Sequence, residues 1–445
     1  MLSIKTHIKE TVKLAIPVSV GQIGHIMMGV VDSLMVGRVG TVPLAAAALV
    51  NGLFFLILVL GIGMTMAITP LVAISKGAKN DDECGMILRQ ALLVNVVFAI
   101  LLLFLIYFGA DFLQYLDQPQ EVVIEAKSYM KILAFSVIPF LVFQVYRQFL
   151  EGISVVKPAM IIAVLANFFN AFSNWCLIFG NLGFEAMGLY GAGISTFLTR
   201  TLMAAILMYY VITSSKYEIY NPTLKYKSIN RKVIKKVVAI GLPSGLQYFL
   251  EVGAFSFSAI MIGWIGAVPL AAHQIAINLA SVTYMIVLGI SAAGTIRVGT
   301  ALGQKSKEGV RTAGFSSLLL AASLMFCFAI LFIVFRNHLP YLYVNEIDVI
   351  ELASSLLIVA ALFQLFDGLQ ATAIGILRGL TDVKIPLLIS FAAYWMLGVP
   401  AGYLLAFVFD FGTVGIWLGF LVGLASVAIL LSLRFNHLTK EKLIY

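Results

Sequence analysis

The chain has 445 residues, of which 61% are apolar and only 11% are charged, and its mean hydropathy is +1.02. A soluble domain is about 45–50% apolar and about 25% charged, and a globule of any size still needs a charged surface. The composition therefore excludes a soluble enzyme and a disordered or fibrous chain. The 37 glycines and the apolar runs of helix length indicate an all-α polytopic membrane protein and not a β-barrel.

Membrane-spanning segments follow one another along the whole chain. A helix that crosses a bilayer needs about 20 mostly apolar residues. The first such segment follows three lysines and lacks a small-residue cleavage site, so we interpret it as a retained span and not as a signal peptide. We predict twelve transmembrane helices, at residues 14–36, 44–74, 87–110, 128–150, 158–180, 188–213, 237–263, 268–298, 312–335, 351–377, 385–409 and 412–433.

The distribution of basic residues predicts the orientation. With a cytoplasmic N-terminus, 25 of the 29 Lys and Arg residues fall in the two termini and the even-numbered connections. Eight of them are assigned to the sixth connection, from Arg200 to Lys236. This excess follows the positive-inside rule, so we predict a multi-pass protein of the cytoplasmic (inner) membrane with both termini cytoplasmic. Topology accounts for the net charge of +8, and no nucleic-acid partner is needed.

The chain contains an internal repeat. Residues 36–46 read VGRVGTVPLAA and residues 262–272 read IGWIGAVPLAA, with seven of eleven positions identical at an offset of 226. Pro17 and Pro243 share this offset. An even number of spans in each half makes the repeats parallel, and such repeats favour transport by alternating access, although duplication also produces channels and scaffolds. We predict an N-terminal six-helix lobe at 1–213, a cytoplasmic linker at 214–236 and a C-terminal six-helix lobe at 237–445.

Three acidic side chains are predicted to lie deep in the membrane, namely Asp32, Glu251 and Asp367. A carboxylate at mid-membrane costs about 2.5–3.5 kcal/mol on insertion scales, so each one needs a cavity, a partner or a proton. We expect no Lys or Arg to lie deep enough to neutralise them. The alternative is a protonated acid buried in a helix contact.

Amide side chains accompany these acids at helical spacing. They could simply join neighbouring helices, because lipid offers an amide no partner. Carboxylates and amides on matched faces of both lobes are better explained by a hydrated binding cleft. The pairs three or four residues apart are Gln247 with Glu251, Gln364 with Asp367, Asn170 with Asn174, and Gln274 with Asn278.

The duplication does not preserve the acids. At the offset of 226, Asp32 corresponds to Ser258, and Glu251 corresponds to His25. His25 precedes Asp32 by seven residues, nearly two helical turns, so both side chains point in the same direction. Each lobe therefore keeps its acid at a different depth, and we expect the two sites to have different functions.

Motifs along nearly the whole chain resemble one transporter family in their order and spacing. They are MGVVDSLMVGRVG (28–40), NAFSNWCLIFG (170–180), QYFLEVG (247–253), AAHQIAIN (271–278) and FDGLQATAIGILRGLTDVKIP (366–386). The sequence resembles the multidrug and toxic compound extrusion (MATE) family and, within it, the NorM-like bacterial branch. The resemblance implies a twelve-helix, two-lobed antiporter that exports organic cations in exchange for Na⁺ or H⁺.

The resemblance also assigns roles to particular residues. It implies an N-lobe cation site at Asp32, Asn170 and Asn174, and it matches Glu251 and Asp367 to the C-lobe acids. Pro17 matches a proline associated with bending of the first helix. Phe363 stands one turn before the last acid, where the family often has an aromatic hydroxyl, which leaves a cation–π surface in place of an oxygen.

These features predict a monomeric transporter of small molecules in the lipid bilayer, and not an enzyme. Its substrates would be cationic amphiphiles, since Phe- and Met-rich walls suit flat aromatic guests. The coupling ion would be Na⁺ or H⁺, with no cofactor and no other metal. The chain has no Walker A motif, so no ATP-driven step is indicated.

Two other functions compete with this one. A lipid-linked oligosaccharide flippase of a related two-lobed fold would line its cleft with Arg or Lys for the pyrophosphate. A membrane-embedded prenyl-pyrophosphate transferase would need paired carboxylates at Mg²⁺-binding spacing. The only acidic cluster, Asp81-Asp82-Glu83, is typical of a solvated loop.

Overall fold

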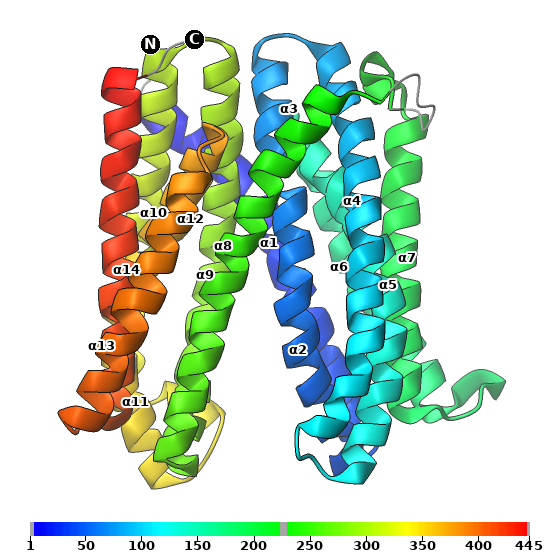
Figure 1. The fold of residues 1–445 in the computed structure, drawn as a ribbon, viewed down its shortest axis with the longest axis vertical. Helices are drawn as coiled ribbons and strands as arrows, with labels where there is room; N and C mark the ends of the chain where they lie inside the picture. Colours follow the sequence, from blue (N-terminus) through cyan, green and yellow to red (C-terminus); the bar gives the residue numbers. More distant parts are fainter. Residues whose placement is uncertain (1–3, 223–228, 443–445) are drawn as a thin grey trace. The chain divides into compact units, whose positions relative to one another are not determined.

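The computed structural model of the protein describes residues 4–222 and 229–442, and Figure 1 shows them as long helices joined by short connections. Within these residues, twelve helical segments are long and apolar enough to cross a membrane, and no strand occurs. The predicted all-α fold with twelve spans is therefore confirmed. The sixth predicted span, 188–213, coincides with its helix.

The described residues of the first half form seven α-helices and three short 3₁₀ turns, the last of which follows the sixth span. They are α1 (Ile4–Gly37), α2 (Thr41–Thr65), α3 (Ile68–Gly77), α4 (Asp81–Gly109), η1 (Ala110–Tyr115), α5 (Gln120–Gly152), α6 (Lys157–Phe179), η2 (Asn181–Gly183), α7 (Gly188–Thr213) and η3 (Ser215–Tyr220). The second predicted span consists of α2 and α3 together.

The helices of the second half include a span with π-helical turns. They are α8 (Arg231–Ile265), α9 (Ala267–Gly303), α10 (Lys307–Phe335), η4 (Leu339–Leu342), α11 (Ile347–Gly379), α12 (Lys384–Phe391), η5 (Ala392–Gly398), α13 (Val399–Tyr403), η6 (Leu404–Val408), α14 (Gly412–His437) and η7 (Leu438–Lys442). The eleventh predicted span consists of α12, η5, α13 and η6.

The chain forms two compact units whose boundaries repeat. The N-terminal unit is Val20–Gly245, and the C-terminal unit is Met1–Ser19 with Leu246–Tyr445. The boundaries after Ser19 and after Gly245 lie 226 residues apart, which is the offset of the sequence repeat. The first part of α1 thus belongs to the C-terminal unit, and the first part of α8 belongs to the N-terminal unit. The lobes predicted from the sequence do not include this exchange.

Small residues at repeat-related positions hold the exchanged segments. A Cβ added to Gly63 in α2 would lie 2.1 Å from the Cα of Gly245 in α8, and one added to Gly289 in α9 would lie 2.1 Å from the Oγ of Ser19 in α1. Gly63 and Gly289 are also 226 residues apart. Ser19 Oγ donates a hydrogen bond to the carbonyl of Ile286 (2.8 Å). Small residues let membrane helices approach this closely, so both contacts depend on them.

The end of α9 is held by the start of α1. Arg297 Nη1 donates to the carbonyl of His7 (2.8 Å) and to Thr11 Oγ1 (2.6 Å). These partners stabilise a polar end, and α9 therefore continues to Gly303, beyond the predicted end at residue 298. An apolar pattern could not indicate this extension, because the partners come from the other end of the sequence.

We predict that Gly63→Ala lowers the thermal stability of the purified protein, because the added Cβ must displace the backbone of α8. Overpacking of this kind typically costs about 1–3 kcal/mol. Gly52→Ala in the same helix is the matched control, since a Cβ there meets nothing within 4 Å. Thermal unfolding followed by fluorescence in detergent compares the two variants, and equal melting temperatures would contradict the proposed role of the contact.

Candidate functional site

Asp32 lies at the centre of a polar cluster in the N-terminal unit. Its side chain in α1 is only 7% exposed. Asn174 Nδ2 in α6 donates to Asp32 Oδ1 (2.6 Å), and Thr196 Oγ1 in α7 donates to Oδ2 (3.2 Å). The same Asn174 amide lies 3.3 Å from Asn170 Oδ1. The structure thus brings together the three N-lobe residues predicted from the sequence, and it adds Thr196.

One oxygen in this cluster is left without a partner. Asn174 Oδ1 is buried and accepts no hydrogen bond from any residue that the structure describes. Buried polar atoms normally have a partner, so an orphaned oxygen beside a carboxylate marks a place for a water or a cation. Hard cations prefer oxygen ligands, and Asp32, Asn174 and Thr196 each present one. Within the described ranges, no group of three His, Cys, Asp or Glu side chains could hold a metal ion.

Arg200 requires a correction to the sequence analysis. It lies in the middle of α7 and not in the sixth connection, one turn after Thr196. Its guanidinium lies 4.8 Å from the ring centroid of Phe140, and Nη1 donates to Ser136 Oγ (2.8 Å). Its charge interacts electrostatically with Asp32. The expectation that no base lies deep enough to neutralise the acids is therefore wrong, because an aromatic face and a hydroxyl stabilise this arginine inside the helix bundle.

His25 and Asp32 both line the interior of the N-terminal unit but contact different helices. The His25 ring stacks on Phe140 of α5 at 5.2 Å between centroids, with 23° between the planes. Its Nε2 is buried and has no partner in the described part of the chain. Further along α5, Arg147 Nε and Glu151 Oε1 form a buried ion pair at 2.7 Å. The interior of this unit is therefore polar well beyond Asp32.

Glu251 and Asp367 form a second cluster, in the C-terminal unit. Glu251 in α8 is 6% exposed and Asp367 in α11 is 5% exposed. Glu251 Oε1 accepts a hydrogen bond from Gln370 Nε2 (3.3 Å) and lies 3.5 Å from the hydroxyl of Tyr284. Asp367 lies within the electrostatic field of Glu251. Two carboxylates in one buried site repel each other unless a proton, a cation or a base lies near them.

Arg378 is a base whose charge acts on this second cluster. It lies in the last turn of α11 and not in the tenth connection, since the helix continues to Gly379. Its charge interacts with Glu251, and its Nε is buried without a partner among the described residues. Because Arg378 stands at a helix end, the expected absence of a deep base is wrong for Arg200 in the N-terminal unit only.

The two amides that are close to these acids in the sequence form hydrogen bonds with side chains of other helices. Gln247 Nε2 in α8 donates to Ser390 Oγ in α12 (2.9 Å). Gln364 Oε1 in α11 accepts from Thr283 Oγ1 in α9 (3.0 Å). Both amides are buried, and they join helices around the acid pair. Gln274 and Asn278, by contrast, are exposed on α9, so the structure does not place them in the buried cluster.

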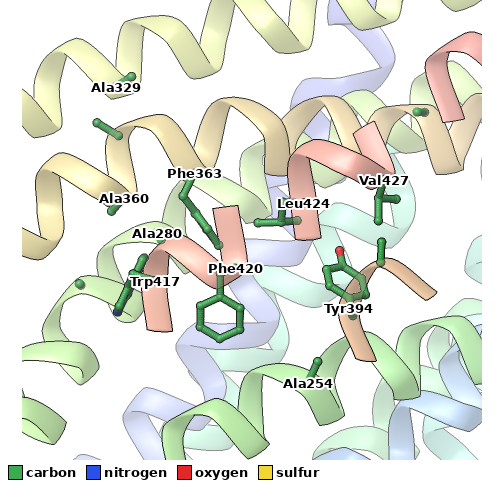
Figure 2. Close-up of a cluster of buried hydrophobic side chains, with 14 of the residues drawn as sticks. Ala254, Ala280, Ala329, Ala360, Phe363, Tyr394, Trp417, Phe420, Leu424 and Val427 are labelled. Carbon is green, nitrogen blue, oxygen red and sulfur yellow. The ribbon is translucent and has the colours of Figure 1, made fainter. Parts of the chain in front are cut away.

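Phe363 lies in the apolar core of the C-terminal unit. It is 2% exposed, and its ring centroid lies 5.3 Å from Trp417, 6.1 Å from Phe255 and 6.3 Å from Phe420. Figure 2 shows Phe363, Trp417 and Phe420 side by side in this cluster. Its ring is enclosed by other aromatic rings, so it packs the core here and offers no open face to a cation.

Pro17 lies inside α1, two residues before the boundary between the units at Ser19. A proline inside a helix removes one backbone hydrogen bond and often causes a kink. Pro243 lies inside α8, two residues before the equivalent boundary at Gly245. Each helix that is shared between the units therefore has a weakened point next to the place where it passes from one unit to the other.

Several residues of these clusters were not predicted from the sequence. Gln370 had a usable signal, because Gln364, Asp367 and Gln370 recur every three residues on one face of α11. Thr196 and Tyr284 had none, since threonine and tyrosine are ordinary in membrane helices. Their roles depend on which helices pack together.

The MatE family model matches residues 17–176 and 243–404. The chain belongs to the MatE family. The two matched segments begin at Pro17 and Pro243, so the family pattern occurs once in each half. The resemblance to this family and the internal repeat predicted from the sequence are both confirmed.

Curated relatives and a solved structure agree with this membership. The MatE chain is 35% identical over 438 residues to the probable multidrug resistance protein NorM of Mesorhizobium japonicum, covering 97% of the chain and 94% of the relative. It is 33% identical over 439 residues to the multidrug resistance protein MdtK of Yersinia pseudotuberculosis, covering 97% and 96%. The crystal structure of the eukaryotic MATE transporter AtDTX14 superimposes with a TM-score of 0.88 at 22% identity, over 99% of this chain and 100% of that one. This last match shows a shared fold.

We predict that Arg200→Met destabilises the MatE chain and that adding Asp32→Asn restores part of the loss. Removal of the guanidinium leaves the buried Asp32 charge uncompensated, and removal of both charges ends that penalty. Side chains in one charge network typically show a coupling energy of about 0.5–3 kcal/mol in a double-mutant cycle. Denaturation of the two single variants and the double variant measures it.

Arg38→Met is the control for this cycle, because Arg38 is exposed at the end of α1. It should change the stability little, with or without Asp32→Asn. Strictly additive effects of Arg200→Met and Asp32→Asn would show that the two charges do not interact.

Proposed function

We propose that this MatE chain is a secondary active multidrug efflux antiporter that exports organic cations in exchange for Na⁺ or H⁺ by alternating access. The observation that carries the proposal is a buried carboxylate cluster in each unit, Asp32 in one and Glu251 with Asp367 in the other. The curated relatives are named as multidrug resistance proteins, which supports efflux of several drugs.

Exchange requires a set of carboxylates that cannot hold both cargoes at once. An entering cation occupies the acids on one side of the membrane, and its release on the other side frees them for the next cycle. One monovalent cation that moves down 100 mV contributes about 2.3 kcal/mol, enough for a roughly fifty-fold gradient of a neutral drug at one-to-one coupling. We assign ion coupling to Asp32 with Asn170 and Asn174, and ion or substrate binding to Glu251 and Asp367.

The proposal extends to location and substrates. The excess of Lys and Arg in the even-numbered connections supports a bacterial inner-membrane protein with both termini in the cytoplasm, even though Arg200 leaves that count. The expected substrates are cationic amphiphiles, because the charge to be bound is opposite to that of the acids. We further propose that the protein works as a monomer without a cofactor, and as a transporter and not as an enzyme.

The two competing functions find less support. The two curated relatives described above are named as multidrug resistance proteins. Arg200 and Arg378 each lie in the field of an acid, which reduces their attraction for a pyrophosphate. Asp81-Asp82-Glu83 forms the first turn of α4, where the Asn80 side chain accepts from the Glu83 amide (3.2 Å). Acids in the first turn of a helix stabilise it, so this cluster is a helix start and not a Mg²⁺ site.

We predict that Asp32→Asn abolishes exchange while the protein remains inserted and folded. The amide keeps the shape of the side chain but loses the charge that couples the two cargoes. Efflux of a fluorescent cation from proteoliposomes, with Na⁺ and pH gradients imposed separately, measures the effect. Asp117→Asn, at an exposed position, is the control and should leave transport unchanged. Export at the wild-type rate by Asp32→Asn would refute coupling through Asp32.

We predict that Glu251→Gln and Asp367→Asn shift the Na⁺ or pH dependence of transport for every substrate alike, because both acids bind the ion. If the acids instead bound the organic cation, both substitutions would weaken the affinity for cations and spare neutral compounds. Transport of one cationic and one neutral substrate against Na⁺ and pH separates the two cases. Glu351→Gln, exposed on α11, is the control. Wild-type behaviour of both variants would make these acids structural.

A further inference from the structure

The eleventh span contains a π-helical segment whose side chains contact α8, the helix that carries Glu251. Ala392–Gly398 and Leu404–Val408 are π-helical, and the intervening and preceding residues are α-helical. Short π-helical turns inside helices are rare and often occur at functional sites, because the extra residue in the turn rotates side chains to new directions. Tyr394 lies in the first of these segments, and its side chain is only 2% exposed.

Contacts with α8 fix the position of Tyr394. The segment meets α8 on both sides of Glu251, so Tyr394 lies opposite the turn that carries this acid. The contacts are the hydrogen bond from Gln247 Nε2 to Ser390 Oγ (2.9 Å), the one from Trp395 Nε1 to the carbonyl of Leu250 (3.0 Å), and the approach of the Tyr394 ring to Phe255 (6.4 Å between centroids).

Glycines of α14 enclose the ring from another side. A Cβ added to Gly423 would lie 3.5 Å from Tyr394 Cδ1, and one added to Gly419 would lie 2.4 Å from the Cα of Gly402. The close approach of α14 leaves the Tyr394 ring little room to turn away. Its hydroxyl is therefore held in the interior of the C-terminal unit.

The Tyr394 hydroxyl has no hydrogen-bond partner among the described residues, although it is buried. A buried phenol normally finds one. The charged groups whose fields reach it are Glu251 and Asp367. Gln370 holds Glu251 through Nε2, while its own Oε1 is also buried without a partner in the described part of the chain. Two neutral oxygens, Tyr394 Oη and Gln370 Oε1, thus remain without a hydrogen bond among the described residues.

Neutral side-chain oxygens without a partner can coordinate a metal cation, whereas binding of a proton does not require them. A proton needs only one carboxylate oxygen, whereas a hard cation gathers several oxygen ligands, charged and neutral. Phe363, one turn before Asp367 on α11, carries no oxygen. In the C-terminal unit, an unpartnered hydroxyl is supplied instead by Tyr394 of the eleventh span.

We propose that the Tyr394 hydroxyl is a neutral ligand for Na⁺ in the cluster of Glu251 and Asp367, and that it sets the affinity of this cluster for the ion. The inference rests on the proposed function only for the ion's role in transport, since Na⁺ binding itself can be measured without a drug.

The test is binding of radioactive Na⁺ to the purified full-length protein in detergent, in an Asp32→Asn background that removes the N-terminal cluster. Tyr394→Phe should raise the Kd for Na⁺ about tenfold, which is about 1.4 kcal/mol, with an unchanged number of sites. Tyr403→Phe is the matched control, because Tyr403 belongs to the same span and is 47% exposed. It should bind Na⁺ as the background protein does.

Other outcomes overturn the proposal. An unchanged Kd in Tyr394→Phe excludes the hydroxyl as a ligand, and a lower number of sites at an unchanged Kd identifies a structural role. If the variant does not fold, 3-fluorotyrosine at position 394 keeps the shape and weakens the oxygen as a ligand, and it must then raise the Kd. Absence of Na⁺ binding in a protein that exports drugs refutes the proposal and leaves the proposed function intact. Na⁺ binding that depends on Tyr394, in a protein that does not export drugs, supports the role of Tyr394 and refutes the proposed function.

Discussion

A carboxylate inside a membrane-spanning helix must be compensated, and this requirement determines the polar interior of both units. Asp32 receives donors from α6 and α7 and lies in the field of Arg200. Glu251 receives donors from α9 and α11 and lies in the field of Arg378. With all groups ionised, Asp32 is opposed by the single charge of Arg200, whereas Glu251 and Asp367 together are opposed by the single charge of Arg378. The second cluster retains one negative charge, which one Na⁺ or one proton would cancel.

The repeat preserves packing and not chemistry. Gly63 and Gly289 correspond, as do Pro17 and Pro243, and the boundaries of the two units fall at equivalent positions. The polar positions differ, since Asp32 corresponds to Ser258. Helix contacts based on small residues tolerate almost no added volume, whereas a polar side chain can change once its partners change. Duplication therefore kept one scaffold while the polar clusters of the two units came to differ.

The parts of the structure that could be predicted from the sequence are local properties of it. A span is a run of apolar residues, and a deep acid is visible as a charge within such a run, so the twelve helices and the three acids could be identified. Arg200 could not be placed, because its stability inside α7 depends on Phe140 and Ser136 of another helix. Tyr394 could not be identified either. Its direction depends on a π-helical turn and on the glycines of α14, and neither leaves a pattern in the sequence of its own span.

Burial of the Asp32 cluster implies that the ion coupling proposed for Asp32 requires the helices around it to move. Asn170 and Asn174 are fully buried and Asp32 nearly so, and the donors that enclose the carboxylate come from α6 and α7. The acid itself lies on α1, whose first part belongs to the C-terminal unit. A rearrangement that separates α1 from α6 and α7 therefore has to deform α1 between the two units. Pro17 lies two residues before that boundary and lacks one backbone donor, so we propose that such a deformation would occur at Pro17.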